Sequence, residues 1–124
     1  MPKIDWYKSC AYNEPRKHFF HREARKRLKE LAGALRLPRH AYDIRSNKGG
    51  VAVSGETTLH AGNIYVQVCQ PATGADSGIL IRTCQGRTDF AGGPNHFFPL
   101  SSLDDIERLA GECHRVLSRK GGQS

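Results

Sequence analysis

The sequence predicts an α+β fold: a meander of four antiparallel strands with an N-terminal and a C-terminal helix packed on it. The chain has 124 residues, a common size for one domain with one hydrophobic core. Apolar residues recur at every third or fourth position near both ends of the chain and at every second position between them. For this order of elements, the simplest way to bury the apolar surfaces is to pack two amphipathic helices on one face of an antiparallel sheet. Residues 1–119 should form the single domain, with residues 1–12 as an N-terminal arm and residues 120–124 as a flexible tail.

The first helix is predicted to begin near Asn13, whose side chain can accept hydrogen bonds from the first free amides of a helix. Pro15 falls in the first turn, where its missing N–H costs nothing. Pro38 should end the helix, because it disfavours helical geometry at the preceding residue. One apolar stripe follows the helix: Phe20, Ala24, Leu28, Leu31 and Leu35.

Four strands joined by short turns are expected after Pro38, because apolar and polar residues alternate there. The alternation is cleanest where Ile64, Val66 and Val68 point inward. Gly55 should form a bulge inside the second strand. The predicted strands are Ala41–Arg45, Val51–Ser54 continuing through Thr57–His60, Ile64–Cys69, and Gly78–Cys84.

The last helix is predicted to begin after Ser101 or Ser102, with Asp104 and Asp105 in its first turn, where the helix dipole favours acids. Its apolar face comprises Leu103, Ile106, Leu109, Ala110, Cys113, Val116 and Leu117.

The net charge of +7 is placed unevenly along the chain. Residues 1–45 hold 12 Lys and Arg against 5 Asp and Glu, whereas residues 46–124 hold 7 of each. A local excess of this kind produces a directed positive field, which favours a polyanionic partner such as DNA or RNA. The alternative is a solvated basic helix that only aids solubility.

The cations that we expect to contact nucleic-acid phosphates lie in the first helix: Arg16, Lys17, Arg22, Arg25, Lys26 and Lys29. Four of them, Arg22, Arg25, Lys26 and Lys29, share the face opposite the apolar stripe. Upstream, three aromatic residues (Trp6, Tyr7 and Tyr12) alternate with lysines and are of a type that stacks on unpaired bases. The alternative, that these aromatics pack onto the sheet, is favoured.

The polar, glycine-rich segment Gln85–His96 is the second candidate site, because long segments without secondary structure are often functional. If the protein is an enzyme, His96 would transfer protons, Asp89 would orient it, and Arg87 would bind an anionic group. His60 would then lie on the rim of the same site. The alternative is a structural loop held by its own backbone hydrogen bonds.

Neither a metal nor a cofactor is expected. His18 and His21, and Cys113 and His114, lack the second ligand pair of a zinc site, and no phosphate-binding loop or nucleophile elbow is present. The four cysteines have no C-x-x-C spacing and should be reduced thiols. With no apolar stretch of about 18 residues and no secretory signal at the start, the protein should be cytoplasmic, with no membrane partner.

Two segments, Ser46–Gly55 (SNKGGVAVSG) and Gly86–His96 (GRTDFAGGPNH), resemble small uncharacterised proteins of bacterial plasmids, integrated elements and phages. This resemblance implies a setting in DNA or RNA handling or host interaction, and no particular activity. The element order also resembles the double-stranded-RNA-binding domain, whose last helix begins with lysines. Here the corresponding residues, Ser101–Asp105, are acidic, so this chain is not assigned to that family.

The function that the sequence favours is nucleic-acid binding through the basic first helix, in a protein of a bacterial mobile element. A small hydrolase or transferase using Gln85–His96 is the second hypothesis, with an enzyme less favoured than a binder. An interaction module whose basic helix docks on an acidic protein is the third. The oligomeric state does not follow from the sequence.

Overall fold

The computed structural model describes residues 4–70, 78–86 and 93–122. It confirms an α+β fold with two helices and an antiparallel sheet, in which the strand order is β1-β2-β3-β4-β5. The strands are β1 (Tyr42–Asn47), β2 (Glu56–Ala61), β3 (Ile64–Cys69), β4 (Ile79–Thr83) and β5 (His96–Phe98). The helices are α1 (Glu14–Ala34) and α2 (Ile106–Gly122), with short 3-10 turns η1 (Arg39–Ala41) and η3 (Leu100–Asp104).

The sheet has five strands, so the prediction of four was wrong. The additional strand, β5, pairs antiparallel with β4, with Phe97 opposite Leu80 and His96 opposite Ile81. It is only three residues long and is followed at once by Pro99, so it carries no alternating pattern of its own. Its strand geometry comes from the edge of β4, which has unpaired backbone groups to offer.

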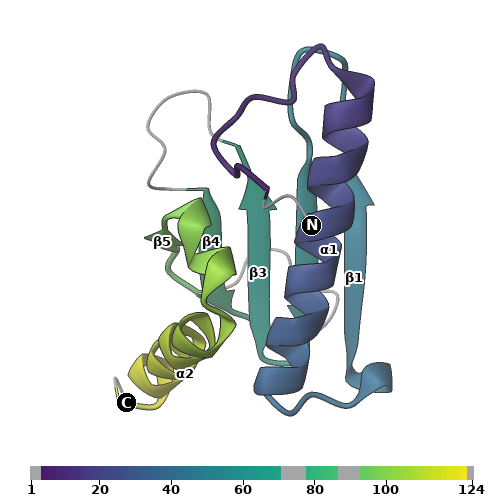
Figure 1. Ribbon diagram of the computed structural model, residues 1–124. Coiled ribbons are helices and arrows are strands. Elements are labelled where there is room, and N and C mark those ends of the chain that lie inside the picture. The colour runs from purple at the N-terminus through teal and green to yellow at the C-terminus, as the bar shows by residue number, and fades with distance from the viewer. Residues whose placement is uncertain (1–3, 71–77, 87–92, 123–124) are drawn as a thin grey trace.

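Both helices contribute to one hydrophobic core on one face of the sheet. In Figure 1, α1 lies in front of the sheet along β1 and β2, while α2 lies toward β4. Leu59, Val66 and Ile81 are aligned across β2, β3 and β4 and are fully buried, as the alternation predicts. Leu28 and Leu109 belong to the same cluster, so the apolar faces of α1 and α2 meet the sheet there.

The connection from β1 to β2 differs from the prediction, because Val51–Ser54 is loop rather than strand. Gly55 has φ +74°, and a Cβ there would lie 2.3 Å from the carbonyl oxygen of Asn47. Only glycine fits this close approach, so the chain turns sharply at Gly55 and the strand begins at Glu56. Val51 and Val53 consequently remain exposed.

The start of α1 is as predicted: Asn13 is the N-cap, and its side-chain oxygen accepts a 3.1 Å hydrogen bond from the amide of Arg16. The C-terminal helix begins later than predicted. Leu100–Asp104 form a 3-10 turn, after which the side chain of Asp105 accepts from the amide of Arg108 at 3.2 Å. Asp105, rather than Ser101 or Ser102, therefore caps α2.

Candidate nucleic-acid interface

The outer face of α1 carries a row of exposed residues that contains no acid: His18, Arg22, Lys26, Lys29 and Gly33. Their spacing of three and four residues places them above one another along the helix. The side chain of Arg22 is 63% exposed, and its guanidinium carbon lies 5.2 Å from the centre of the Phe19 ring. Arg22, Lys26 and Lys29 thus present three cations over about 10 Å of helix.

Three other cations of the predicted set contact acceptors of the protein itself. Lys17 is 2% exposed, and its ammonium group donates to the carbonyl oxygens of Lys48 at 3.0 Å and Gly50 at 2.8 Å. Arg25 donates to the carbonyl oxygen of Ile44 in the edge strand β1 at 3.3 Å. These side chains connect α1 to the sheet and to the loop after β1.

Arg16, the third, donates to the carbonyl oxygen of Ser9 at 3.4 Å and connects α1 to the N-terminal arm. The burial of Lys17 could be predicted from the sequence, because Lys17 stands three residues before Phe20 and so lies on the apolar side of the helix. The contacts of Arg16 and Arg25 depend on the tertiary fold, and no pattern in the sequence predicts them.

His21 also points into the protein, between α1 and β2. Its Nε2 lies 2.7 Å from the carbonyl oxygen of Ser54, and its Nδ1 lies 3.1 Å from the hydroxyl of Thr57. Because a carbonyl only accepts, Nε2 carries the proton and Nδ1 accepts from Thr57. Burial lowers the pKa of His21, so the neutral ring is favoured.

This arrangement separates the two histidines that are spaced three residues apart. His18 is exposed on the outer row, whereas both ring nitrogens of His21 already have protein partners. Within residues 4–70, 78–86 and 93–122, no three His, Cys, Asp or Glu side chains gather in a way that could hold a metal. In the same ranges the four cysteines, as expected, are free thiols.

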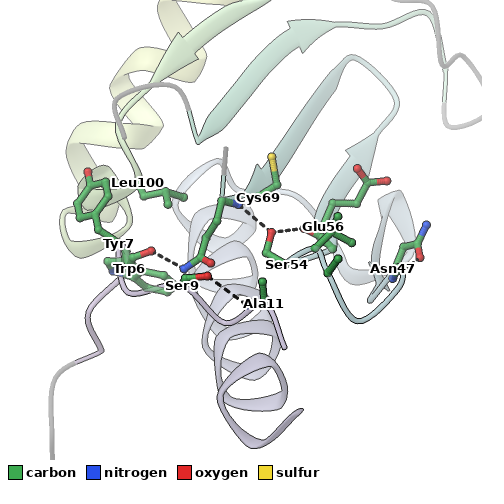
Figure 2. A pocket seen from close by; sticks show the side chains of 14 residues that line it. Trp6, Tyr7, Ser9, Ala11, Asn47, Ser54, Glu56, Cys69 and Leu100 are labelled. Carbon is green, nitrogen blue, oxygen red and sulfur yellow. Dashed lines mark hydrogen bonds between the residues drawn. The ribbon is translucent and has the colours of Figure 1, made fainter. Parts of the chain in front are cut away.

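The N-terminal arm forms one wall of a groove of about 750 Å³ (Figure 2). The loop after β1, the ends of β2 and β3, and Leu100 of η3 form the rest. Glu56 and Cys69 face each other across the strand pair. Burial and the nearby Glu56 carboxylate raise the pKa of the Cys69 thiol. A thiol with a raised pKa is less ionised at neutral pH and is a weaker nucleophile.

The aromatic residues of the arm divide into two kinds. Trp6 is 2% exposed, donates from Nε1 to the Asp104 carboxylate at 3.0 Å and packs edge-on against Phe20. It belongs to the core, as the favoured interpretation predicted. Tyr7 and Tyr12, by contrast, are 43% and 78% exposed.

Gln70, which the sequence did not single out, fastens the arm to the sheet. Its Nε2 donates to the carbonyl oxygens of Trp6 at 2.9 Å and Lys8 at 2.8 Å, and its Oε1 accepts from the amide of Cys10 at 3.1 Å. The backbone amide of Gln70 in turn donates to the Ser54 hydroxyl at 3.1 Å. One side chain just after β3 thus satisfies three backbone groups of the arm.

The second candidate site is only partly described, because Arg87 and Asp89 lie outside the described residues. His96 is opposite Ile81 in the sheet and lines a shallow groove of about 370 Å³ together with Glu112 and Arg115 of α2. Arg115 is paired with Glu112 through a hydrogen bond.

His60 does not join His96, because the two rings lie on opposite faces of the sheet. Residues directly opposite each other in neighbouring strands share a face, so His60 shares a face with Tyr65 and Arg82. His96 is opposite Ile81, which directly precedes Arg82 in β4 and therefore points to the other face. The His60 ring packs edge-on against Tyr65, and its Nε2 lies 3.0 Å from the carbonyl oxygen of Gly86.

Comparison with known proteins found no matching family model, no similar curated protein and no similar solved structure. None of the helices in the described parts of the chain is long and apolar enough to cross a membrane.

Proposed function

We propose that this protein binds nucleic acid through the outer face of α1, with Arg22, Lys26 and Lys29 contacting phosphates. The observation that carries the proposal is the exposed row itself: three cations on one helical face, with His18 and Gly33 at its ends and no acid within it. Clustered cations bind a polyphosphate backbone and release its counterions.

The charges around the row support the same partner. Arg36 and Arg39 are exposed just after the C-terminal end of α1, so exposed cations continue in the chain beyond the row. The acids beside the row are few: Glu23 lies 3.8 Å from Arg22, and Glu30 lies 3.5 Å from Arg27. An ion pair at 3.8 Å contributes little, and the Arg22 side chain remains 63% exposed. The proposal also places the protein in a plasmid, integrated element or phage, which is the setting that the sequence resemblance implies.

The test is the salt dependence of binding to single-stranded and duplex DNA and RNA. Three phosphate contacts predict a slope of log affinity against log salt of about −2.7 for duplex DNA and about −2.1 for a single strand. In the variant Arg22→Gln/Lys26→Gln, the duplex slope should become shallower by about 1.8, because two contacts are lost.

The matched control is Arg108→Gln/Arg115→Gln, which removes two exposed cations from α2. It should leave the slope unchanged. Equal weakening by both double variants would show that only net charge matters, and would overturn the assignment to α1. An absence of binding at low salt would remove the proposal and favour the acidic protein partner, which fits the same exposed row.

A further inference from the structure

The arm and the loop after β1 form an exposed apolar patch at the N-terminal end of α1, and we name it the arm patch. It consists of Tyr12, Val51 and Val53, which are 78%, 62% and 51% exposed. Tyr7, by contrast, lies against η3, where its hydroxyl accepts a 3.0 Å hydrogen bond from the amide of Ser101. The arm and the loop are joined directly, because the amide of Tyr12 donates to the carbonyl oxygen of Val51 at 2.6 Å. Solvent-exposed side chains of this size in one place are typical of an interaction surface.

The ring of Tyr12 is exposed to solvent, and its backbone adopts an unfavourable conformation. Its φ is +61°, a left-handed conformation in which L side chains other than Asn and Asp are uncommon. Two backbone hydrogen bonds hold this conformation in place. The amide of Tyr12 donates to the carbonyl oxygen of Val51, and the amide of Asn13 donates to that of Cys10 at 3.2 Å. The ring makes little contact with the protein, so core packing does not explain why a tyrosine stands here.

Three cations lie near the arm patch in the arm, in α1 and in the loop, together with one exposed acid, Glu14. Lys8 and Lys48 are exposed, and the guanidinium of Arg16 lies against the carbonyl oxygen of Ser9. Lys17 holds the loop against the first turn of α1, so the Lys48 and Tyr12 segments are neighbours. From Asn13 to Lys29 the helix rises about 24 Å, and the basic row begins within that length. The arm patch thus lies at the N-terminal end of the helix that carries the row.

We infer that the arm patch binds unpaired bases, so that the nucleic acid of the proposed function is single-stranded; the inference rests on that function. A surface that offers an exposed aromatic ring beside cations suits a strand whose bases and phosphates are both accessible, whereas a duplex hides the faces of its bases. The Tyr12 ring stacks on a base, and Arg22, Lys26 and Lys29 contact phosphates further along the strand.

The experiment compares three ligands of equal phosphate number: an oligothymidylate, an abasic strand and a duplex. Stacking predicts that the oligothymidylate binds about 5-fold to 100-fold more tightly than the abasic strand. Tyr12→Ala should remove most of this difference and leave the abasic strand unchanged, whereas Tyr12→Phe should retain it. Alanine keeps the same backbone requirement at this position, so the fold is disturbed little. Phe97→Ala, which removes an aromatic ring that is 54% exposed in β5, is the matched control and should have no effect.

The outcomes separate this inference from the proposed function. If Arg22→Gln/Lys26→Gln weakens every ligand while Tyr12→Ala weakens none, the phosphate contacts stand and the base-binding patch is overturned. The same holds if the wild-type protein binds abasic and base-bearing strands equally. If no ligand binds at low salt, both the proposed function and this inference are overturned.

Discussion

The ammonium group of Lys17 lies 2.8 Å from the carbonyl oxygen of Gly50, and the Lys17 side chain is 2% exposed. A cation of the basic helix thus points away from solvent and fastens the loop after β1 to α1. Its second bond, to the carbonyl oxygen of Lys48, satisfies another backbone acceptor of the same loop. Lys17 therefore acts in the fold, whereas Lys26, nine residues later on the opposite face, remains exposed.

Replacement of this cation should destabilise the protein. Lys17→Met keeps the apolar stem but leaves the carbonyls of Lys48 and Gly50 without their donor, so the free energy of unfolding should fall by about 2–3 kcal/mol. Urea denaturation measures the change. Lys26→Met, the matched control on the exposed row, should change stability by less than about 0.5 kcal/mol. Equal stability of the two variants would contradict the role assigned to Lys17.

The stability of the protein should depend on pH through His21. Burial lowers the pKa of His21 below its ordinary value of 6.5, so the folded state binds fewer protons than the unfolded state in the window below that value. Its contribution is fully present above about pH 6.5 and is lost as the pH falls from there toward the folded-state pKa. Wild type and His21→Gln should therefore differ less in stability at pH 5.5 than at pH 7.5. A constant difference between wild type and His21→Gln across this range would refute the prediction.

Local sequence signals predicted β3 to the residue and the cap of α1, because each depends on neighbours in the chain. Ile64–Cys69 alternates strictly, and Asn13 needs only the amide three residues ahead. β5 could not be predicted in this way, because its strand geometry depends on the distant edge of β4. In the candidate interface, Arg22, Lys26 and Lys29 have the exposure that helical spacing predicts. Arg25 does not, because its acceptor belongs to β1.

At the C-terminus of α1, replacing Arg36 with glycine should stabilise the protein. The amides of Arg36 and Leu37 donate to the carbonyls of Gly33 and Ala32, which is the Schellman pattern, and Arg36 has φ +58°. Glycine adopts this conformation without steric cost, so Arg36→Gly should raise the free energy of unfolding by about 1 kcal/mol. Thermal and urea denaturation test this. Arg39→Gly, at an exposed residue with no such requirement, should not stabilise, and a destabilised Arg36→Gly would contradict the assignment.

Gln70 should control whether the N-terminal arm stays docked. Gln70→Met keeps the size of the side chain but removes its bonds to the backbone of Trp6, Lys8 and Cys10, so the arm should detach more often from the sheet. Trp6 is the only tryptophan of the chain and is buried when the arm is docked, so its fluorescence reports this change directly. In native buffer the emission of Gln70→Met should shift to longer wavelength, and acrylamide should quench it more strongly. Gln67→Met, three residues earlier on β3, should leave both properties unchanged. An unaltered Trp6 signal in Gln70→Met would show that the edge-on contact with Phe20 and the bond to Asp104 hold the arm without Gln70.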